Sequence, residues 1–511
     1  MHPALAFFVE DLPLGKEVPP TMFEKFLPIL ILLVVVTLVI SRLPRVDLGE
    51  HKHTPKFRIR RVMNWLPLGL TYAFLYMGRY NLTVSKGKFG DILDPDGLPM
   101  MGNADFGYIF GVGTVVYGVS FLINGPLTDR LGGKFAILMG AGGAAIANVL
   151  MGLATWTLIH HGWGYESVAK NFVLVFSVLY AMNMYFQSFG AVAIVKVNAS
   201  WFHIRERGVF GAIFGILISL GVYFAFDIGA MIRDSESLGL TWVFFVPAII
   251  LAGFWIIDFV QVRNSPAEAG LRDFDLDDAS SGDVGESKTA KEVFSMMLRN
   301  PVILTIAGVE FCSGFLRQAI MQWYQSFAKQ TNAVLELKSG FVSEHWGMLL
   351  CCAGILGGVF AGTISDHLFK SRRGPVAAVL YAVLLVGAIY LCFGYQAGLV
   401  GFVVIFMSMA VIGVHGMLSG TASMDFGGSK NVGVAVGIID GFVYLGTGLM
   451  AVTYGLILPK VEMDPVTKVL IDHTADPDNW LAWPVAMVPM AAIGLFLAIR
   501  LWNASAQRKA A

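Results

Sequence analysis

Two related stretches of sequence decide the fold. The first reads Gly125-Pro-Leu-Thr-Asp129-Arg130-Leu-Gly132-Gly-Lys134 and follows a long apolar run. The second reads Gly362-Thr-Ile-Ser-Asp366-His-Leu-Phe-Lys370 and follows another apolar run much later in the chain. Their leading glycines and their aspartates are both 237 residues apart (362 − 125 and 366 − 129), so the pattern predicts two parallel copies of one helical unit.

The composition places these copies in a membrane. Of the 511 residues, 56% are hydrophobic and 14% are charged, and the mean hydropathy is +0.67. Soluble globular chains have about 45–50% apolar and about 25% charged residues. About 20 apolar residues span a bilayer as a helix, so the chain has material for about a dozen spans. These values exclude a soluble enzyme, a nucleic-acid-binding protein and a secreted disulfide scaffold.

Thirteen apolar runs predict an all-α membrane protein. We interpret the first run as an extra transmembrane helix ahead of a core of twelve helices, arranged in two groups of six. The runs lie at Phe26–Ile40, Met63–Val84, Phe106–Pro126, Phe135–Leu158, Asn171–Val195, Val209–Met231, Trp242–Val260, Val302–Phe327, Trp346–Ile364, Pro375–Phe393, Leu399–Ser419, Val432–Leu458 and Leu481–Trp502.

The predicted domain boundaries follow from these runs. A polar stretch rich in aspartate separates the two groups of six and is expected to be a solvated linker. The predicted domains are an N-terminal tail with the extra helix and a basic linker (1–62), an N-terminal six-helix bundle (63–260), a cytoplasmic linker (261–300), a C-terminal six-helix bundle (301–503) and a cytoplasmic tail (504–511).

The charges of the loops predict the orientation in the membrane. One set of loops is basic, as at residues 56–61 and 370–373, whereas the alternate loops at residues 91–105 and 462–478 are acidic. The positive-inside rule makes the basic loops cytoplasmic. We therefore expect an integral multi-pass protein of a bacterial inner (plasma) membrane, with its N-terminus outside and its C-terminus in the cytoplasm.

The sequence shows no pattern for enzymatic chemistry or for a metal. The four cysteines, Cys312, Cys351, Cys352 and Cys392, all lie inside apolar runs, so no structural disulfide is expected. The histidines lack metal-binding spacing, and no glycine-rich phosphate loop follows a strand. We expect a protein that is not an enzyme, without catalytic residues, cofactors or metal sites.

Arg79 and Arg317 are the most informative charges. Each lies inside the first helix of its group, and the two are 238 residues apart (317 − 79). An arginine inside a membrane helix costs at least about 2.5–3.5 kcal/mol, so it normally faces a polar cavity and has a partner. Two guanidinium groups from equivalent helices can converge on one dianion and bind it bidentately. The alternative is separate pairing with carboxylates, for instance Arg317 with Glu310.

Other polar side chains extend this candidate anion site. Tyr72, Tyr76 and Arg79 stand at i, i+4 and i+7 and share one helix face. Glu310 and Asp440 lie near the middle of their helices, where a carboxyl group can take up and release a proton, so both are candidates for coupling. The remaining candidates for substrate binding are Tyr117, Gln318, Gln322 and Tyr444.

The first quoted loop resembles the signature loop of major facilitator superfamily transporters. Its glycine permits close helix contact, its aspartate can cap a helix N-terminus, and its basic residues can bridge to a neighbouring helix end. The resemblance implies the major facilitator fold, with two pseudo-symmetric six-helix bundles. It also implies a gating latch on the cytoplasmic side, for which a structural turn is the alternative. The gating residues are Gly125, Asp129, Arg130, Gly132, Lys134 and Asp366.

The chain also resembles one branch of that superfamily, the organophosphate:phosphate antiporters, over about residues 63–503. The resemblance implies that Arg79 and Arg317 clamp the substrate phosphate and that the four candidate tyrosines line the site. Four positions depart from the family pattern: Phe121 replaces a lysine, Ile218 replaces a histidine, and Gln322 and Cys351 replace acids. The matching segments are Gly78-Arg79-Tyr-Asn81, Arg263-Asn-Ser-Pro266, Phe315-Leu316-Arg317 and Tyr444-Leu-Gly446.

The predicted function is secondary active transport by alternating access. We expect exchange of a phosphorylated metabolite, a sugar or glycerol phosphate, for inorganic phosphate. The protein is expected to work as a monomer in the lipid bilayer, without a nucleic-acid partner. Two alternatives stay open: a proton-coupled symporter of a carboxylate or other organic anion, and a transporter-like membrane sensor of a phosphate ester.

Overall fold

The computed structural model describes Val34 and residues 54–203, 206–273, 290–369, 373–464, 466–467 and 469–502. The chain divides into two units, Met1–Arg45 and Val46–Ala511, and the second contains all the elements considered below. Within the predicted extra helix Phe26–Ile40, Val34 is helical and exposed, and the rest lies outside the described residues. Residues 274–289 of the predicted linker and 503–511 of the C-terminal tail also lie outside them.

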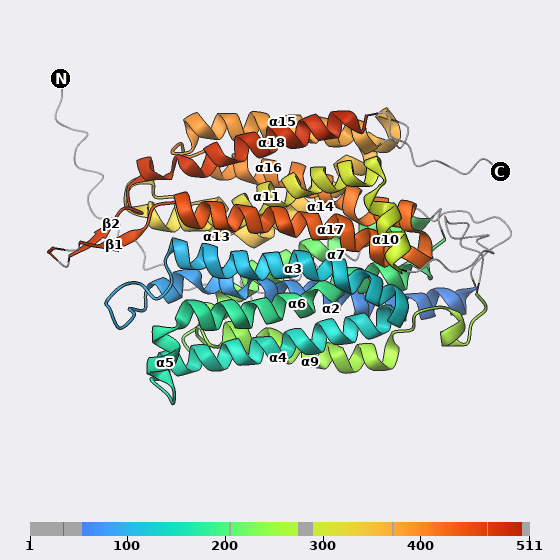
Figure 1. Cartoon of the computed structure of the whole chain (residues 1–511), viewed down its shortest axis with the longest axis horizontal. Coiled ribbons are helices and arrows are strands. Elements are labelled where there is room, and N and C mark those ends of the chain that lie inside the picture. Colours follow the sequence, from blue (N-terminus) through green and yellow to red (C-terminus); the bar gives the residue numbers. More distant parts are fainter. Residues whose placement is uncertain are drawn as a thin grey trace, which may run out of the picture. The chain divides into compact units, whose positions relative to one another are not determined.

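All twelve predicted core runs form helices, which lie side by side along the unit (Figure 1). Two of them continue through a π-helical segment. The helices are α2 (Pro55–Gly90), α3 (Asn103–Leu131), α4 (Gly133–His160), α6 (Phe172–Ala199), α7 (Arg207–Tyr223) continued by η2 (Phe224–Ile228) and α8 (Gly229–Arg233), α9 (Trp242–Gln261), α11 (Pro301–Gln330), α14 (Trp346–Leu368), α15 (Arg373–Gly394), α16 (Val400–His415) continued by η4 (Gly416–Ala422), α17 (Ser423–Ile457) and α18 (Ala482–Arg500).

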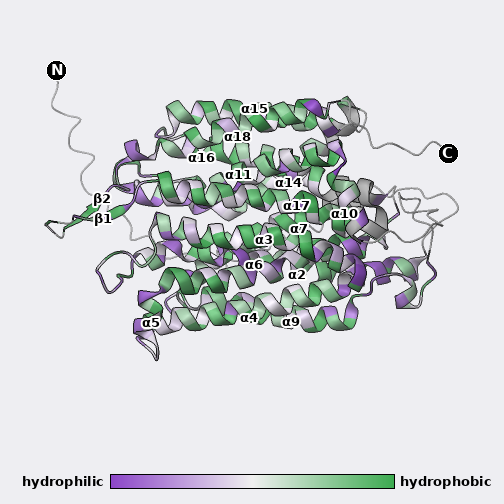
Figure 2. Cartoon of the chain, viewed as in Figure 1, coloured by the Kyte–Doolittle hydropathy of each residue, from purple (hydrophilic) through white to green (hydrophobic). Residues whose placement is uncertain are grey.

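The helix bodies are apolar enough for a bilayer. Ten helices in the described part of the chain are long and apolar enough to cross a membrane, and Trp346–Ala361 of α14 is a shorter apolar helix. Helix α2 is 36 residues long and falls outside the ten. Figure 2 shows hydrophobic residues along the helices and hydrophilic residues mainly at their two ends.

The sequence did not predict the short elements at the helix ends. The antiparallel hairpin of β1 (Val461–Met463) and β2 (Leu470–Asp472) precedes the last helix. Strands of three residues are too short to give a readable alternation of polar and apolar residues. The other short elements are α5 (Tyr165–Lys170), η3 (Ala267–Ala269), α10 (Ala290–Leu298), α12 (Asn332–Leu335), α13 (Phe341–Glu344) and η5 (Pro477–Trp480).

The two helices that carry the arginines begin in the same way. Thr54 Oγ1 accepts the backbone N–H of Phe57 (3.2 Å), and Pro55 is the first residue of α2. Asn300 Oδ1 accepts the backbone N–H of Val302 (2.9 Å), and a proline again opens α11. A side-chain acceptor followed by proline satisfies the free N–H groups of a helix start. The capping explains why α2 begins eight residues before its apolar run.

Glycines bring α3 and α17 into direct backbone contact along their length. A Cβ atom at Gly125 would overlap the backbone carbonyl of Gly433, and one at Gly118 would lie 2.9 Å from the carbonyl oxygen of Gly441. Small residues permit this close approach of membrane helices. We call α2 to α9 the first half and α11 to α18 the second half, so this contact joins the two halves.

The helices have two distinct ends. The loop 91–102, α5 and the hairpin lie at the left in Figure 1, where α2 ends. The start of α2, the end of α3 and α10 lie at the right. We call these the Asp91 end and the Asp129 end, after one residue close to each.

Candidate functional site

Arg79 lies inside α2 and contacts both halves. Its side chain is buried, with the residue 1% exposed. Its Nε donates a hydrogen bond to Gln187 Oε1 of α6 (3.2 Å), and Nη1 donates to the Tyr444 hydroxyl of α17 (2.9 Å). Its Nη2 has no hydrogen-bond partner among the described residues. The guanidinium group therefore joins the halves and keeps one nitrogen available for another acceptor.

Three tyrosine rings surround the Arg79 guanidinium group. Its Cζ lies 4.4 Å from the ring centre of Tyr76, 4.7 Å from that of Tyr117 and 5.8 Å from that of Tyr444. The Tyr117 hydroxyl is buried and has no hydrogen-bond partner in the described part of the chain. Aromatic faces stabilise a cation where water is excluded, and they leave the N–H groups free for hydrogen bonds.

Three further aromatic residues, Tyr72, Phe214 and Phe121, extend this tyrosine cluster. Tyr72 lies against Tyr76 (ring centres 5.5 Å apart) and stacks on Phe214 at 5.5 Å. Phe121, which stands where the resembled family has a lysine, stacks on Tyr444 at 5.8 Å. An apolar ring thus fills that position, so α3 contributes aromatic packing there instead of a charge.

Arg317 joins the same cluster from α11. It is 4% exposed, and its Nε and Nη2 have no hydrogen-bond partner among the described residues. A Cβ atom at Gly314 would overlap the carbonyl oxygen of Val443, so α11 touches α17 one turn from Arg317 and next to Tyr444. Tyr76 and Tyr444 lie in the electrostatic field of both arginines. The structure therefore brings Arg79 and Arg317 to one group of tyrosines.

Gln318 and Gln322 bind each other and α2 in this structure. Gln318 Nε2 donates to the Tyr80 hydroxyl (2.9 Å), and Gln322 Nε2 donates to Gln318 Oε1 (2.6 Å). The Thr83 hydroxyl of α2 donates to Gln322 Oε1 (2.5 Å). Both predicted glutamines lie beside the arginines, on the side of the Asp91 end, and connect the two halves.

The buried acids lie in a separate group on the second half. Glu310 is fully buried and its Oε2 lies 2.9 Å from Nδ1 of His415, whereas its Oε1 has no hydrogen-bond partner in the described chain. Asp440 Oδ1 accepts a hydrogen bond from Ser419 of η4. The pairing of Arg317 with Glu310, considered as an alternative, does not occur among the described residues, where Glu310 contacts His415 instead.

His415 was missed by sequence reasoning because its spacing to other histidines carries no signal. It ends α16 at the point where the π-helix η4 begins, and π-helical segments often mark functional sites. No group of three or more His, Cys, Asp or Glu side chains that could hold a metal ion occurs among the described residues.

Asp129 connects the two halves at the Asp129 end. Its Oδ1 lies 2.6 Å from Nζ of Lys196 in α6. The carboxylate also accepts the backbone N–H groups of Gly433 (3.1 Å) and Val434 (3.0 Å) in α17. Lys196 was not predicted, because it lies 67 residues from Asp129 and only the fold brings the two together.

Gly132 and Lys134 of the predicted gating loop also lie at this end. Gly132 has φ +91°, a conformation that favours glycine. Lys134 Nζ donates to the carbonyl oxygen of Phe259 at the end of α9 (2.7 Å). Arg130 is exposed, and the side chain of Asp366 lies outside the described part of the structure.

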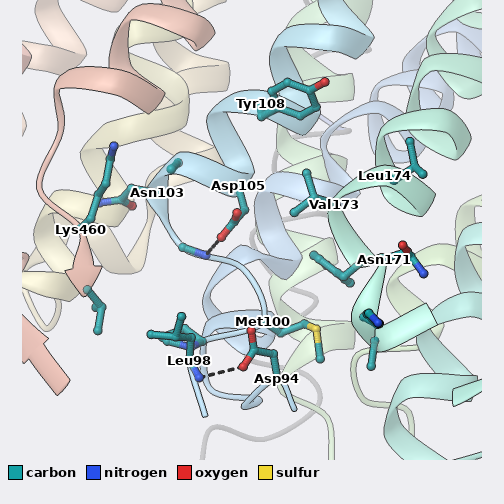
Figure 3. Close-up of a pocket in the computed structure, with 17 residues that line it drawn as sticks. Asp94, Leu98, Met100, Asn103, Asp105, Tyr108, Asn171, Val173, Leu174 and Lys460 are labelled. Atoms are coloured by element: carbon teal, nitrogen blue, oxygen red, sulfur yellow. Dashed lines mark hydrogen bonds between the residues drawn. The ribbon is translucent and has the colours of Figure 1, made fainter. Parts of the chain in front are cut away.

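A pocket of about 650 Å³ lies at the Asp91 end, between the loop 91–102, the start of α6 and the hairpin (Figure 3). Its two carboxylates already accept backbone N–H groups: Asp105 that of Gly102 (2.8 Å) and Asp94 that of Leu98 (2.8 Å). Lys460 also lines the pocket. These hydrogen bonds make the carboxylates part of the loop structure and not a free binding group.

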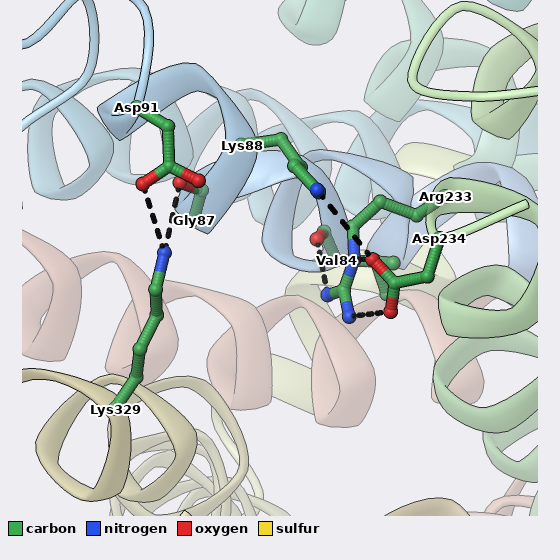
Figure 4. A network of polar contacts seen from close by, with 7 residues as sticks. All are labelled: Val84, Gly87, Lys88, Asp91, Arg233, Asp234 and Lys329. Atoms are coloured by element: carbon green, nitrogen blue, oxygen red, sulfur yellow. Dashed lines mark hydrogen bonds and ion pairs between the residues drawn. The ribbon is translucent and has the colours of Figure 1, made fainter. Parts of the chain in front are cut away.

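Ion pairs at the Asp91 end are of two kinds, one between the halves and one within the first half (Figure 4). Lys329 of α11 lies 3.2 Å from Asp91 at the end of α2, so this pair bridges the halves. Arg233 binds Asp234 through Nε (2.9 Å) and Nη2 (2.6 Å), within the first half. Partial burial opposes ionisation of Asp234, but the Arg233 side chain offsets it and lowers the pKa of that carboxyl group.

These features define a helical membrane protein with two buried arginines between two halves. The family model of the Major Facilitator Superfamily matches residues 27–451, and the chain belongs to this superfamily. The solved structure of a bacterial homolog of the human lysosomal transporter Spinster matches with a TM-score of 0.60, over 88% of this chain and 98% of that one, at 13% identity. The expected major facilitator fold is confirmed, and the chain is an integral multi-pass membrane protein.

Three curated relatives match nearly the whole chain. The glycerol-3-phosphate transporter of Bacillus subtilis (strain 168) is 24% identical over 89% of this chain and 95% of its own length. A probable hexose phosphate transport protein of Chlamydia trachomatis serovar D is 23% identical, over 88% and 93%. The membrane sensor protein UhpC of Salmonella typhimurium is 23% identical, over 90% and 96%. The predicted resemblance to organophosphate transporters is thereby confirmed.

Proposed function

We propose that the protein is a secondary transporter that exchanges a phosphorylated metabolite for inorganic phosphate by alternating access. The observation that carries this proposal is the pair of buried arginines. Three guanidinium nitrogens, Nη2 of Arg79 and Nε and Nη2 of Arg317, have no hydrogen-bond partner among the described residues. Neither arginine forms an ion pair with a carboxylate within that part of the chain.

A phosphoryl group fits this arrangement chemically. Its tetrahedral oxygens accept hydrogen bonds from two guanidinium forks at once, and such charge-assisted bonds are roughly twice as strong as neutral ones. The Tyr117 hydroxyl, which has no partner among the described residues, and the Tyr444 hydroxyl add donors on the Arg79 side. Inorganic phosphate and a phosphate ester present the same group, so one site serves both partners of an exchange.

Alternating access accounts for the contacts on both sides of the arginines. Lys329 and Asp91 bridge the halves at one end, and Asp129 binds the N–H groups of Gly433 and Val434 at the other. A central site is exposed to each side in turn when the contacts at one end open while the contacts at the other end stay closed. When the contacts at the Asp91 end open, Gln318 and Gln322 lose their hydrogen bonds to α2. Their side chains then become available to the organic part of the substrate.

We place the Asp129 end in the cytoplasm. The basic loops at that end and the acidic loops at the Asp91 end support this orientation through the positive-inside rule. The N-terminus then lies outside and the C-terminus inside. We further propose the inner membrane of a bacterium as the location and a monomer as the functional unit.

Exchange in proteoliposomes tests the proposal. Purified protein is reconstituted with internal radiolabelled phosphate, and release is measured on external addition of phosphate, glycerol-3-phosphate, a hexose phosphate or a dicarboxylate. We expect release on addition of phosphate and of at least one phosphate ester, and none with the dicarboxylate. Binding of a phosphate ester without any exchange contradicts transport and indicates a sensor, the role that the name of one relative gives.

A second candidate function is proton-coupled transport of an organic anion. The observation that favours it is the contact between Glu310 and His415, because a buried carboxyl group beside an imidazole can hold a transferable proton. Asp440 and Arg317 lie in the field of the same carboxyl group. Uptake driven by a pH gradient, and abolished by Glu310→Gln or Asp440→Asn, supports this candidate. Exchange at a rate that does not depend on the pH gradient contradicts proton coupling.

A further inference from the structure

Lys86 is a buried lysine that the proposed function does not use. It lies seven residues after Arg79 in α2, which is two turns and about 10.5 Å further along the helix axis. The residue is 6% exposed, whereas the next lysine of the helix, Lys88, is 49% exposed at its side chain. Lysine is almost never buried to this extent unless it is paired.

Both halves contribute to the surroundings of Lys86. Its Nζ donates a hydrogen bond to the Ser326 hydroxyl of α11 (2.8 Å). The same atom lies 4.1 Å from the ring centre of Trp323 in α11 and 4.7 Å from that of Phe106 in α3. The two rings meet edge to face at 5.5 Å. The ammonium group is thus held between a hydroxyl group and two aromatic faces.

No anion neutralises Lys86 in the described part of the chain. An ammonium group has three donors, and Ser326 is the one acceptor that it reaches there. The charged side chain that acts on it most is Lys329, a second cation, whose own partner is Asp91. Removing an ammonium group from water without a counter-ion is unfavourable, so the site is better matched to a bound anion than to its empty form.

Lys86 lies in α2 between Arg79 and the Asp91 end of the helix. Arg79, Thr83 and Lys86 stand at i, i+4 and i+7 and share one face of α2. That face meets α11, through Thr83 with Gln322 and Lys86 with Ser326. Beyond them, Lys329 of α11 reaches Asp91 and the carbonyl oxygen of Gly87 at the end of α2 (Figure 4). When α2 and α11 separate at this end, Lys86 is the first buried cation that an entering anion meets.

We propose that Lys86 is a third phosphate-binding group, which holds the phosphoryl group between the Asp91 end and the Arg79–Arg317 pair. The inference rests on the proposed exchange of phosphate compounds and adds to it a binding site on one side of the clamp. In the closed form Ser326 and the two rings hold the ammonium group in place. In the open form the phosphoryl oxygens replace Ser326 as its acceptors.

The test is the apparent KM for phosphate, measured separately from the two faces of the reconstituted protein. Lys86→Met keeps the length and apolar stem of the side chain but removes the charge. We expect the KM from the face of the Asp91 end to rise about tenfold and the KM from the opposite face to change less than about twofold. Lys86→Arg keeps a cation and is expected to stay near the wild-type value.

Thermal stability separates binding from a structural role. Loss of an unneutralised buried charge leaves the Tm of Lys86→Met unchanged or higher, whereas loss of a structural brace lowers it. Lys86→Gln is the second variant in case the thioether does not fit the site. Lys88→Met is the matched control on the same helix, because Lys88 is half-exposed and lies 4.0 Å from Asp234 within the first half.

The outcomes distinguish this inference from the proposed function. A one-sided rise in KM for Lys86→Met or Lys86→Gln, absent from Lys88→Met, supports a phosphate site at Lys86. An unchanged KM, with or without a lowered Tm, or an equal rise from both faces, overturns the Lys86 site while exchange by the wild type stands. A wild type that exchanges no phosphate overturns the proposed function and the Lys86 site together.

Discussion

The Arg79 guanidinium group donates a hydrogen bond to the Tyr444 hydroxyl across the boundary between the two halves, at 2.9 Å. Arg79 belongs to α2 and Tyr444 to α17, 365 residues later in the chain. Both residues are buried, and Tyr444 also lies in the field of Arg317. Any movement that opens the arginine site must therefore change this contact, so it reports directly on the transport cycle.

Removal of the Tyr444 hydroxyl is expected to weaken phosphate binding. Tyr444→Phe keeps the ring that faces Arg79 but removes the acceptor that orients Nη1. A hydrogen bond to a charged group contributes about 1.5–3 kcal/mol, so we expect the Kd for phosphate to rise by about tenfold or more. The measurement is the phosphate-induced shift in Tm, titrated for both proteins.

The matched control is Tyr454→Phe, ten residues later on the same helix. The Tyr454 hydroxyl is also buried and donates to the carbonyl oxygen of Trp483 (2.8 Å), within the second half. This variant is expected to lower the Tm without changing the Kd for phosphate. Equal effects of the two variants on the Kd would argue against a specific role for Tyr444.

Neutralising Asp129 is expected to slow exchange while leaving substrate binding intact. The carboxylate binds Lys196 at 2.6 Å and two N–H groups of α17, so it holds the halves together at one end. We expect Asp129→Asn to lower the exchange rate about tenfold and to change the Kd for phosphate by less than about twofold. Asp96→Asn, an exposed residue at the other end, serves as control. A lost phosphate-induced Tm shift in Asp129→Asn would contradict a purely gating role.

A methyl group at Gly125 is expected to block the close contact of α3 and α17. The added Cβ would overlap the backbone carbonyl of Gly433, which cannot move aside as a flexible side chain can. We expect Gly125→Ala to lower the Tm by several degrees and to reduce exchange strongly. Gly253→Ala is the control, since no atom lies within 4 Å of its added Cβ on the exposed side of α9. Exchange at the wild-type rate by Gly125→Ala would show that exchange does not need the close contact of α3 and α17 at this position.

The sequence predicted the long helices well because one physical pattern governs them. Each apolar run has the length of a bilayer, and each of the twelve core runs became a helix. The ends were harder to predict. Thr54 extends α2 beyond its apolar run through a cap, and the hairpin before α18 is too short to give a periodic signal. The extra first helix stays a prediction.

Individual site residues were predictable where a charge stood in an apolar run. Arg79 and Arg317 stood out for that reason, and Tyr72 and Tyr76 followed from their spacing to Arg79. Partners from distant parts of the chain gave no such signal. His415 beside Glu310 and Lys196 beside Asp129 depend on how the helices pack. Their roles, like those of the predicted site residues, await the experiments described above.

The most direct test of the central claim is phosphate exchange by Arg79→Lys and Arg317→Lys in proteoliposomes. Lysine keeps the charge but replaces the planar fork by a single ammonium group, so bidentate binding is lost. We predict that each variant loses at least about 100-fold in exchange rate, or about 2.7 kcal/mol, while Arg299→Lys, an exposed arginine after α10, stays normal. Exchange at the wild-type rate by either site variant would contradict the arginine clamp.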